Sequence, residues 1–135
     1  MRSACERTIE AKMGQTTFEE ILSRMNNEGQ FTATVLASDD GLPVAAVPTP
    51  SPYSADTMAA MVTLVKGFIQ DTQSQLGLAE VDEVSIVVGD RSRLICRYFT
   101  AGDRPLVLAI IAPPGRTYRR LTTRAIHEID QAWEK

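Results

Sequence analysis

The sequence predicts a mixed α/β fold, a five-stranded antiparallel sheet with one long helix on one face and two helices on the other. Residues 31–47 have the alternation and turn of a hairpin, and residues 54–76 have the spacing of a long amphipathic helix. Residues 106–112 are apolar at every position, which is typical of a strand covered on both faces. A chain of 135 residues is long enough for one such domain.

The N-terminal part of the chain divides near residue 16. Residues 1–16 show no convincing apolar face, so we expect a tail or a helix extension there and the folded domain over residues 17–135. Thr17 and Glu20 form a capping-box pattern that predicts a helix start. The apolar face of this helix recurs at the helical spacing, and Gly29 ends it. Its members are Phe18, Ile21, Leu22 and Met25.

The hairpin begins with apolar residues that alternate with polar ones from Phe31 to Ser38. Asp40-Gly41 predicts a type I′ turn, in which both central residues have positive φ. Leu42–Val47 is the returning strand, and Pro43 restricts it to a sheet edge, since proline donates no ladder hydrogen bond. The prolines of residues 48–53 exclude a helix before Ser54.

The long helix is expected to be capped by Ser54 and closed by Gly77. Ala60 and Gly67 keep the opposite face thin, which indicates either close approach of another helix or simple tolerance of small residues. The expected main apolar stripe, widened by Leu64 and Phe68, comprises Met58, Met61, Val62, Val65, Ile69 and Leu76.

Three strands and a helix complete the chain. The strands are expected at Val81–Val88, Arg93–Phe99 and Leu106–Ala112, with the last one central in the sheet. The final helix runs to about Trp133 after the break at Pro113-Pro114-Gly115. Its apolar face comprises Tyr118, Leu121, Ala125, Ile129 and Ala132.

This order of elements, with an Asp-Asp-Gly-Leu-Pro turn at residues 39–43, Ala45-Ala46 in the next strand and Ala59-Ala60-Met61 in the long helix, resembles the Roadblock family. The family includes dynein light chains and GTPase regulators. The resemblance covers Thr17 to Trp133 and implies a profilin-like Roadblock fold with strand order 2-1-5-4-3. The edge position of Pro43 and the central apolar strand agree with that order independently.

Composition excludes several function classes. A net charge of −3 disfavours a nucleic-acid-binding protein, and the absence of GxxxxGK[ST] excludes a P-loop nucleotidase. Cys5 and Cys96 form no disulfide framework, and with His127 they are too few for a structural metal, so we expect no cofactor. No signal peptide is visible, and the longest apolar run is too short to span a bilayer. We therefore expect a cytoplasmic protein without membrane insertion.

No catalytic residue stands out. His127 is expected at the surface or in helix packing, Asp39 and Asp40 in turn chemistry, and the acids Glu80, Asp82 and Glu83 on a solvated face. Arginines recur on one side of the first turns of the last helix, as a solvated stripe or as a docking site for an acidic partner or anion. They are Arg116, Arg119, Arg120 and Arg124.

The resemblance implies a non-enzymatic homodimer that binds a Ras-like small GTPase. In such relatives the third strands pair and the long helices pack together. Here the third strand is an apolar edge guarded only by Asp82 and Glu83, which also favours pairing. The candidate dimer contacts are Ala60, Leu64, Gly67, Phe68, Val84, Ile86 and Val88. The candidate partner contacts are Lys66, Gln70 and Gln73, expected on the outward surface of the paired helices, and the four arginines.

An alternative function is small-molecule sensing by a PAS-, GAF- or profilin-like domain, since such modules share this size and mix of elements. A sensor needs polar groups that converge in an apolar cavity, and the sequence shows no such set. An enzyme ranks last.

Overall fold

The computed structural model describes residues 4–47 and 54–133, and only the backbone of residues 4–16. The expected proline-rich connection at residues 48–53 lies outside the described residues. The observed element order is α-β-β-α-β-β-β-α, as predicted. The bounds are α1 Ala4–Gly29, β1 Ala33–Ser38, β2 Pro43–Ala46, α2 Ala55–Leu76, β3 Glu83–Val87, β4 Arg93–Ala101, β5 Arg104–Ala112 and α3 Arg119–Trp133.

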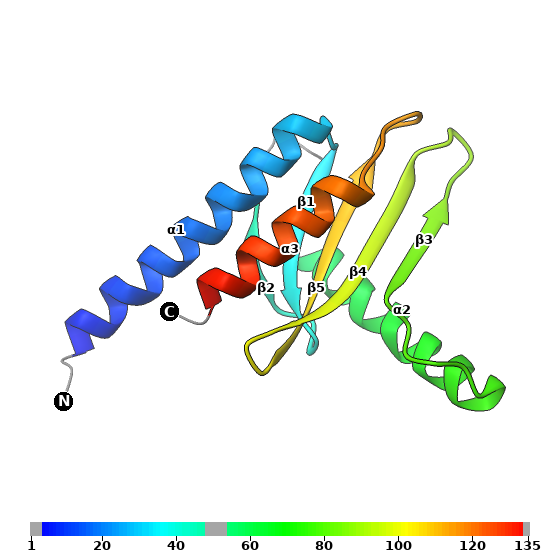
Figure 1. Ribbon diagram of the computed structural model, residues 1–135, viewed down its shortest axis with the longest axis horizontal. Coiled ribbons are helices and arrows are strands. Elements are labelled where there is room, and N and C mark those ends of the chain that lie inside the picture. Colours follow the sequence, from blue (N-terminus) through cyan, green and yellow to red (C-terminus); the bar gives the residue numbers. More distant parts are fainter. Residues whose placement is uncertain (1–3, 48–53, 134–135) are drawn as a thin grey trace.

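The strands form one antiparallel sheet in the order β2-β1-β5-β4-β3, which confirms the predicted order. α1 and α3 lie against each other on one face, and α2 covers the other (Figure 1). β2, with Pro43, is at one edge and β3 is at the other, while the apolar strand β5 lies between β1 and β4. The described helices include none that is long and apolar enough to cross a membrane.

α1 begins well before the predicted start. It is continuous from Ala4 to Gly29, so the capping-box prediction was wrong, because Thr17 and Glu20 lie inside a helix that needs no cap there. The predicted apolar face is confirmed, since Phe18, Ile21, Leu22 and Met25 are all buried. The division into residues 1–16 and a domain at 17–135 stays a prediction.

The β1–β2 hairpin differs from prediction in its turn and in its burial. Gly41 has φ 88°, but Asp39 and Asp40 do not have positive φ, so the predicted type I′ turn is wrong. The N–H of Gly41 donates to the Ser38 carbonyl, which makes Asp39 and Asp40 the centre of a turn followed by a left-handed glycine. The carboxylate of Asp40 accepts a hydrogen bond from Ser38 Oγ, so its role in turn chemistry is confirmed.

β1 is buried at all six positions, including the polar ones. The hydroxyl of Thr34 donates to Oδ1 of Asn26 at 2.6 Å, and both side chains are buried. This bond between α1 and β1 satisfies two polar groups that would otherwise be costly in the core.

α2 has the predicted caps. Ser54 accepts the N–H of Thr57, and Gly77 takes the left-handed conformation with φ 67° and ψ 29°. Its buried residues, Met58, Ala59 and Val62, all come from the first part of the helix. The expected stripe is therefore wrong at Met61 and Leu76, which are exposed. The helix contacts mainly β1, β2 and β5, and its C-terminal end reaches past β3 in Figure 1.

Candidate functional site

Large apolar side chains are exposed on α2 and at β3. Phe68 is 73% exposed and Leu64 is 70% exposed, and they share one side of α2 with Met61 by the i, i+3, i+7 spacing. Ile86 and Val88 are also exposed. Such side chains at the surface mark an interaction site or an aggregation hazard. We call Met61, Leu64, Phe68, Ile86 and Val88 the exposed apolar surface.

The two parts of the exposed apolar surface lie on the same face of the sheet. Val84 packs into the core between α2 and the sheet. Because side chains alternate along a strand, Ile86 and Val88 point to this α2 face too, while Glu83 and Val87 point to the α3 face. α2 has few contacts with β3 and β4, so it leaves this end of the sheet partly uncovered. A helix from another chain could pack there.

β3 also offers free backbone groups. It pairs only with β4, from Glu83 opposite Arg97 to Val87 opposite Arg93, and its other side has no strand neighbour in the described sheet. The strand is shorter than predicted, since Val81, Asp82 and Val88 lie outside it. Ala60 and Gly67 of α2 are exposed, and a Cβ added at Gly67 would meet open space. The glycine is therefore not required by contacts within the described chain.

Lys66, Gln70 and Gln73 lie together on α2, with Gln70 exposed and the other two half-buried, and their role in partner binding stays a prediction. They line a cavity of about 280 Å³ between the C-terminal half of α2, residues 80–82 and the ends of β4 and β5. Gln73 Oε1 accepts the N–H of Val81 at 3.2 Å. The remaining lining residues are Ile69, Glu80, Val81, Asp82, Tyr98, Phe99, Thr100, Pro105 and Leu106. Burial raises the pKa of Tyr98 to about 12, so its hydroxyl stays protonated at neutral pH.

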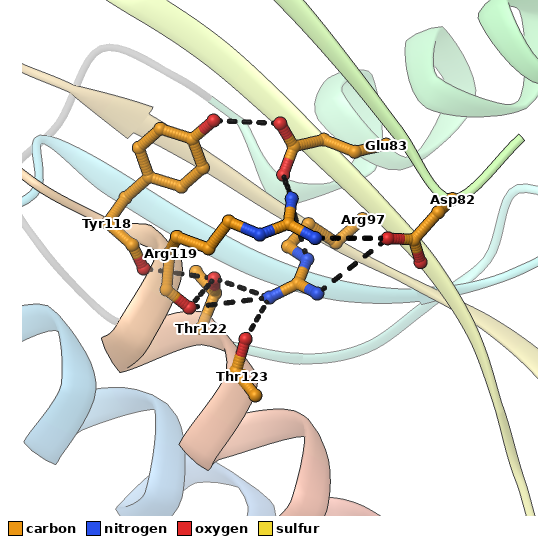
Figure 2. A network of polar contacts seen from close by, with 7 residues as sticks. All are labelled: Asp82, Glu83, Arg97, Tyr118, Arg119, Thr122 and Thr123. Atoms are coloured by element: carbon orange, nitrogen blue, oxygen red, sulfur yellow. Dashed lines mark hydrogen bonds and ion pairs between the residues drawn. The ribbon is translucent and has the colours of Figure 1, made fainter.

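A cluster of charged residues ties β3 and β4 to α3 (Figure 2). Arg97 is buried, 7% exposed, and its Nη1 donates to the hydroxyls of Thr122 at 2.9 Å and Thr123 at 2.7 Å. Its Nε has no hydrogen-bond partner, and the nearest carboxylate oxygen is Oε1 of Glu83 at 3.7 Å. A buried guanidinium is costly without a neighbouring carboxylate, so Glu83 stabilises the fold by compensating the charge of Arg97.

Tyr118 and Arg119 complete this cluster from the start of α3. Tyr118 donates its hydroxyl hydrogen to Oε2 of Glu83 at 2.7 Å, and this hydrogen bond is the main reason that the pKa of Tyr118 is raised. Arg119 donates to Glu83 at 2.8 Å and to Asp82 at 3.4 Å. The expected solvated face is therefore wrong for Glu83, whose side chain is 18% exposed, whereas Asp82, 63% exposed, lies at the surface as expected. We call Asp82, Glu83, Arg97, Tyr118 and Arg119 the charge cluster.

The four candidate arginines are not one unpaired stripe. Arg116 precedes α3, contrary to prediction, and contacts Gln30. Arg119 belongs to the charge cluster, and Arg124 pairs with Glu28 of α1. Arg120 is exposed. These contacts use arginine charge to hold α3 against its neighbours, and a role in partner binding stays a prediction.

Arg97 is the residue that sequence reasoning missed. Its position in the apolar strand Arg93–Phe99 places one charge among inward-facing residues, which was the available signal. Its partners are more than twenty residues away in α3, or in the preceding strand, so no local pattern identifies them. Cys96 is a free cysteine with a buried side chain. Burial raises the pKa of its thiol to about 12. The side chain of Cys5 lies outside the described residues.

Comparison with known proteins identifies relatives of this fold. The family model for the Roadblock/LC7 domain matches residues 17–112. A search of curated proteins found no match.

Solved structures with the same fold include several bacterial proteins. Myxococcus xanthus MglB has a TM-score of 0.76 and 14% identity, with 88% of this chain and 89% of that chain covered. The gliding protein MglB from Thermus thermophilus has a TM-score of 0.74 and 19% identity, with coverage of 99% and 94%. An MglB structure described as having a tetrameric arrangement has a TM-score of 0.71 and 23% identity, with coverage of 99% and 93%.

Proposed function

Because this chain belongs to the Roadblock/LC7 family, we propose that it is a cytoplasmic, non-enzymatic interaction module that forms a homodimer and binds a Ras-like small GTPase, as regulator or scaffold. The observation that carries the proposal is the exposed apolar surface beside the unpaired edge of β3. A second copy would cover both features, and family membership supports a GTPase-related role.

The dimer would form in two ways at once. Antiparallel pairing of two β3 strands would satisfy the free backbone groups of the edge. The α2 helix of each copy would then pack over the uncovered end of the other copy's sheet. Leu64 and Phe68 of both helices would become buried in this contact. Such an interface would bury about 1,600 Å² in total. One described MglB structure has a tetrameric arrangement, which is consistent with self-association among proteins of this fold.

The GTPase would supply the nucleotide site. The sequence lacks a phosphate loop, so the dimer is expected to bind no nucleotide by itself. A two-fold surface can receive one GTPase across its axis, which gives a complex of two chains with one GTPase. Switch segments of a Ras-like protein order around the γ-phosphate, so a regulator can act by changing their conformation.

Calorimetry tests this function. The purified protein is titrated with the Ras-like GTPases of its own organism, each loaded with GDP or with a non-hydrolysable GTP analogue. We expect one of these GTPases to bind with different affinity in its two nucleotide states. Absence of binding to every one of them in both states would overturn the proposal.

Two variants then locate the GTPase surface. Lys66→Glu with Gln70→Glu changes the cavity side of α2, and Arg120→Glu changes an exposed residue at the start of α3 outside the charge cluster. Loss of binding in only one variant assigns the surface to that helix, provided that both variants keep the circular dichroism spectrum and the oligomeric mass of the wild type.

Small-molecule sensing is the second candidate, and the cavity favours it. Lys66, Tyr98 and Thr100 place polar groups against the apolar side chains of Ile69 and Leu106. Among the described side chains, no ion pair involves Lys66. A thermal-shift screen of metabolites separates the candidates, because a sensor would be stabilised by one compound in the wild type and not in Lys66→Ala.

A further inference from the structure

We propose that the charge cluster positions the start of β3 for pairing with a second copy, and that ionic strength regulates self-association through it. This inference rests on the proposed function, because it takes β3 as the pairing edge. The cluster does not touch the exposed apolar surface. Glu83 faces α3, whereas Ile86 and Val88 face α2. It therefore acts through the position of the strand.

The start of β3 has no strand on its outer side and needs other contacts to fix it. The irregular segment before it is held on the α2 side by the hydrogen bond from the N–H of Val81 to Gln73. The Asp82 carbonyl accepts the N–H of Tyr98 at 2.9 Å. The first contact lies on the α2 face and the second lies in the plane of the sheet, so neither fixes this segment from the α3 face.

The charge cluster supplies the contacts from the other face (Figure 2). Arg119 binds both Asp82 and Glu83, so one guanidinium joins two successive residues at the start of the edge strand. Tyr118 holds the second oxygen of Glu83. Arg119 is the first residue of α3 and Tyr118 directly precedes it. Their contacts therefore fix the position of the pairing edge relative to α3.

Arg97 explains why Glu83 cannot simply turn away. Arg97 is directly opposite Glu83 in the β3–β4 ladder and is buried against α3. Releasing Glu83 would leave a buried cation whose nearest remaining carboxylate is Asp82, at 4.0 Å. The inner pair thus keeps Glu83 beside Arg97, while the outer pairs of Arg119 with Asp82 and Glu83 complete the positioning of the strand start and are the ones that the solvent reaches.

The outer pair is open to salt. The side chains of Arg119 and Asp82 are 59% and 63% exposed, so dissolved ions screen their attraction. An apolar interface alone is not weakened by sodium chloride, because screening acts on charges. The direction of the salt effect therefore separates the cluster from the apolar contacts.

Analytical ultracentrifugation of the full chain tests the inference. The Kd of self-association is measured at 50 and 500 mM NaCl for the wild type, Arg119→Met, Arg119→Lys and the matched control Arg120→Met. We expect the wild-type Kd to rise about five-fold with salt, as screening removes exposed ion pairs present in both copies. Arg119→Met should raise the Kd about five-fold at 50 mM and abolish most of the salt dependence.

The controls make the result decisive. Arg119→Lys, which keeps the charge, should retain the salt dependence, and Arg120→Met should behave as the wild type. Equal Kd values for Arg119→Met and Arg120→Met at both salt concentrations would overturn this inference and leave the dimer intact. A wild type that stays monomeric at every concentration and both salt concentrations would overturn the proposed dimer as well, so the two failures are distinguishable.

Discussion

Arg97 and Glu83 are directly opposite each other in the β3–β4 ladder, with Nε of Arg97 3.7 Å from Oε1 of Glu83. The Arg97 side chain is 9% exposed and that of Glu83 is 18% exposed. Among the described residues, the other carboxylate paired with this guanidinium is that of Asp82, whose Oδ2 lies 4.0 Å from Nη2 of Arg97. The edge strand is thus attached to its neighbour by side-chain charge as well as by backbone hydrogen bonds.

The first prediction concerns the removal of this charge. Glu83→Gln should lower the free energy of unfolding by about 1–3 kcal/mol, because it leaves the buried guanidinium without its nearest carboxylate. Urea unfolding followed by circular dichroism measures the change. Glu80→Gln, an exposed carboxylate three positions earlier, is the control and should be close to neutral. Equal effects of the two substitutions would contradict the assigned role of Glu83.

The second prediction concerns the bond between α1 and β1. Asn26→Ala should cost about 1–3 kcal/mol, because the hydroxyl of Thr34 loses its acceptor inside the core. Asn27→Ala removes the same side chain from the next, exposed position and should change stability little. Thermal unfolding of both variants checks the difference. A midpoint for Asn26→Ala no lower than that of Asn27→Ala would refute it.

The third prediction concerns alkaline pH. Burial raises the pKa of Cys96 from its ordinary value of 9.0 to about 12. Above pH 9 the unfolded thiol loses its proton while the folded thiol keeps it, so the unfolded state binds fewer protons and stability falls as pH rises. The slope contributed by this one thiol is at most about 1.4 kcal/mol per pH unit and ends near pH 12.

Urea unfolding between pH 8 and pH 10 measures this slope. Cys96→Ala should remove most of the decline between pH 8 and pH 9, below the ordinary pKa of 10.0 at which Tyr98 is half ionised in the unfolded chain. An identical pH dependence in the variant and the wild type would show that the thiol does not contribute.

The fourth prediction concerns the exposed apolar surface. Phe68→Ala should weaken self-association about ten- to hundred-fold, since a large apolar side chain buried in an interface stabilises it by about 1.5–3 kcal/mol. The stability of the monomer should change little, because Phe68 is 73% exposed. Gln70→Ala, on another side of the same helix, is the control. Equal Kd values for the two variants would place the interface elsewhere.

The fold was predictable where local signals and tertiary packing agree. Ser54 and Gly77 bound α2 in the structure as in the sequence, because a side-chain acceptor and a left-handed glycine act within a few residues. The central position of β5 followed from its unbroken apolar run, and Pro43 identified an edge. The start of α1 was not predictable, since the capping pattern at Thr17 is equally compatible with a helix interior.

The candidate site was less predictable, because it depends on contacts between distant residues. Leu64 and Phe68 were expected beside the core stripe, but their exposure depends on how far α2 extends beyond the sheet. The cavity that Lys66 lines was not predicted, because residues 80–82 and the ends of β4 and β5 lie beside the second half of the helix, a placement that no local pattern encodes. Arg97 was missed for the same reason, since its partners come from β3 and α3.

The mass of the protein in solution tests the central claim most directly. Light scattering across micromolar concentrations should give twice the 14.8 kDa chain mass for the wild type. Ile86→Asp should give the monomer mass, because a charge on the pairing edge opposes burial. Leu42→Asp, the same kind of change at an exposed apolar residue of the hairpin near the other sheet edge, should remain dimeric. A monomeric wild type, or a dimer unaffected by Ile86→Asp, would contradict self-association through β3 and α2.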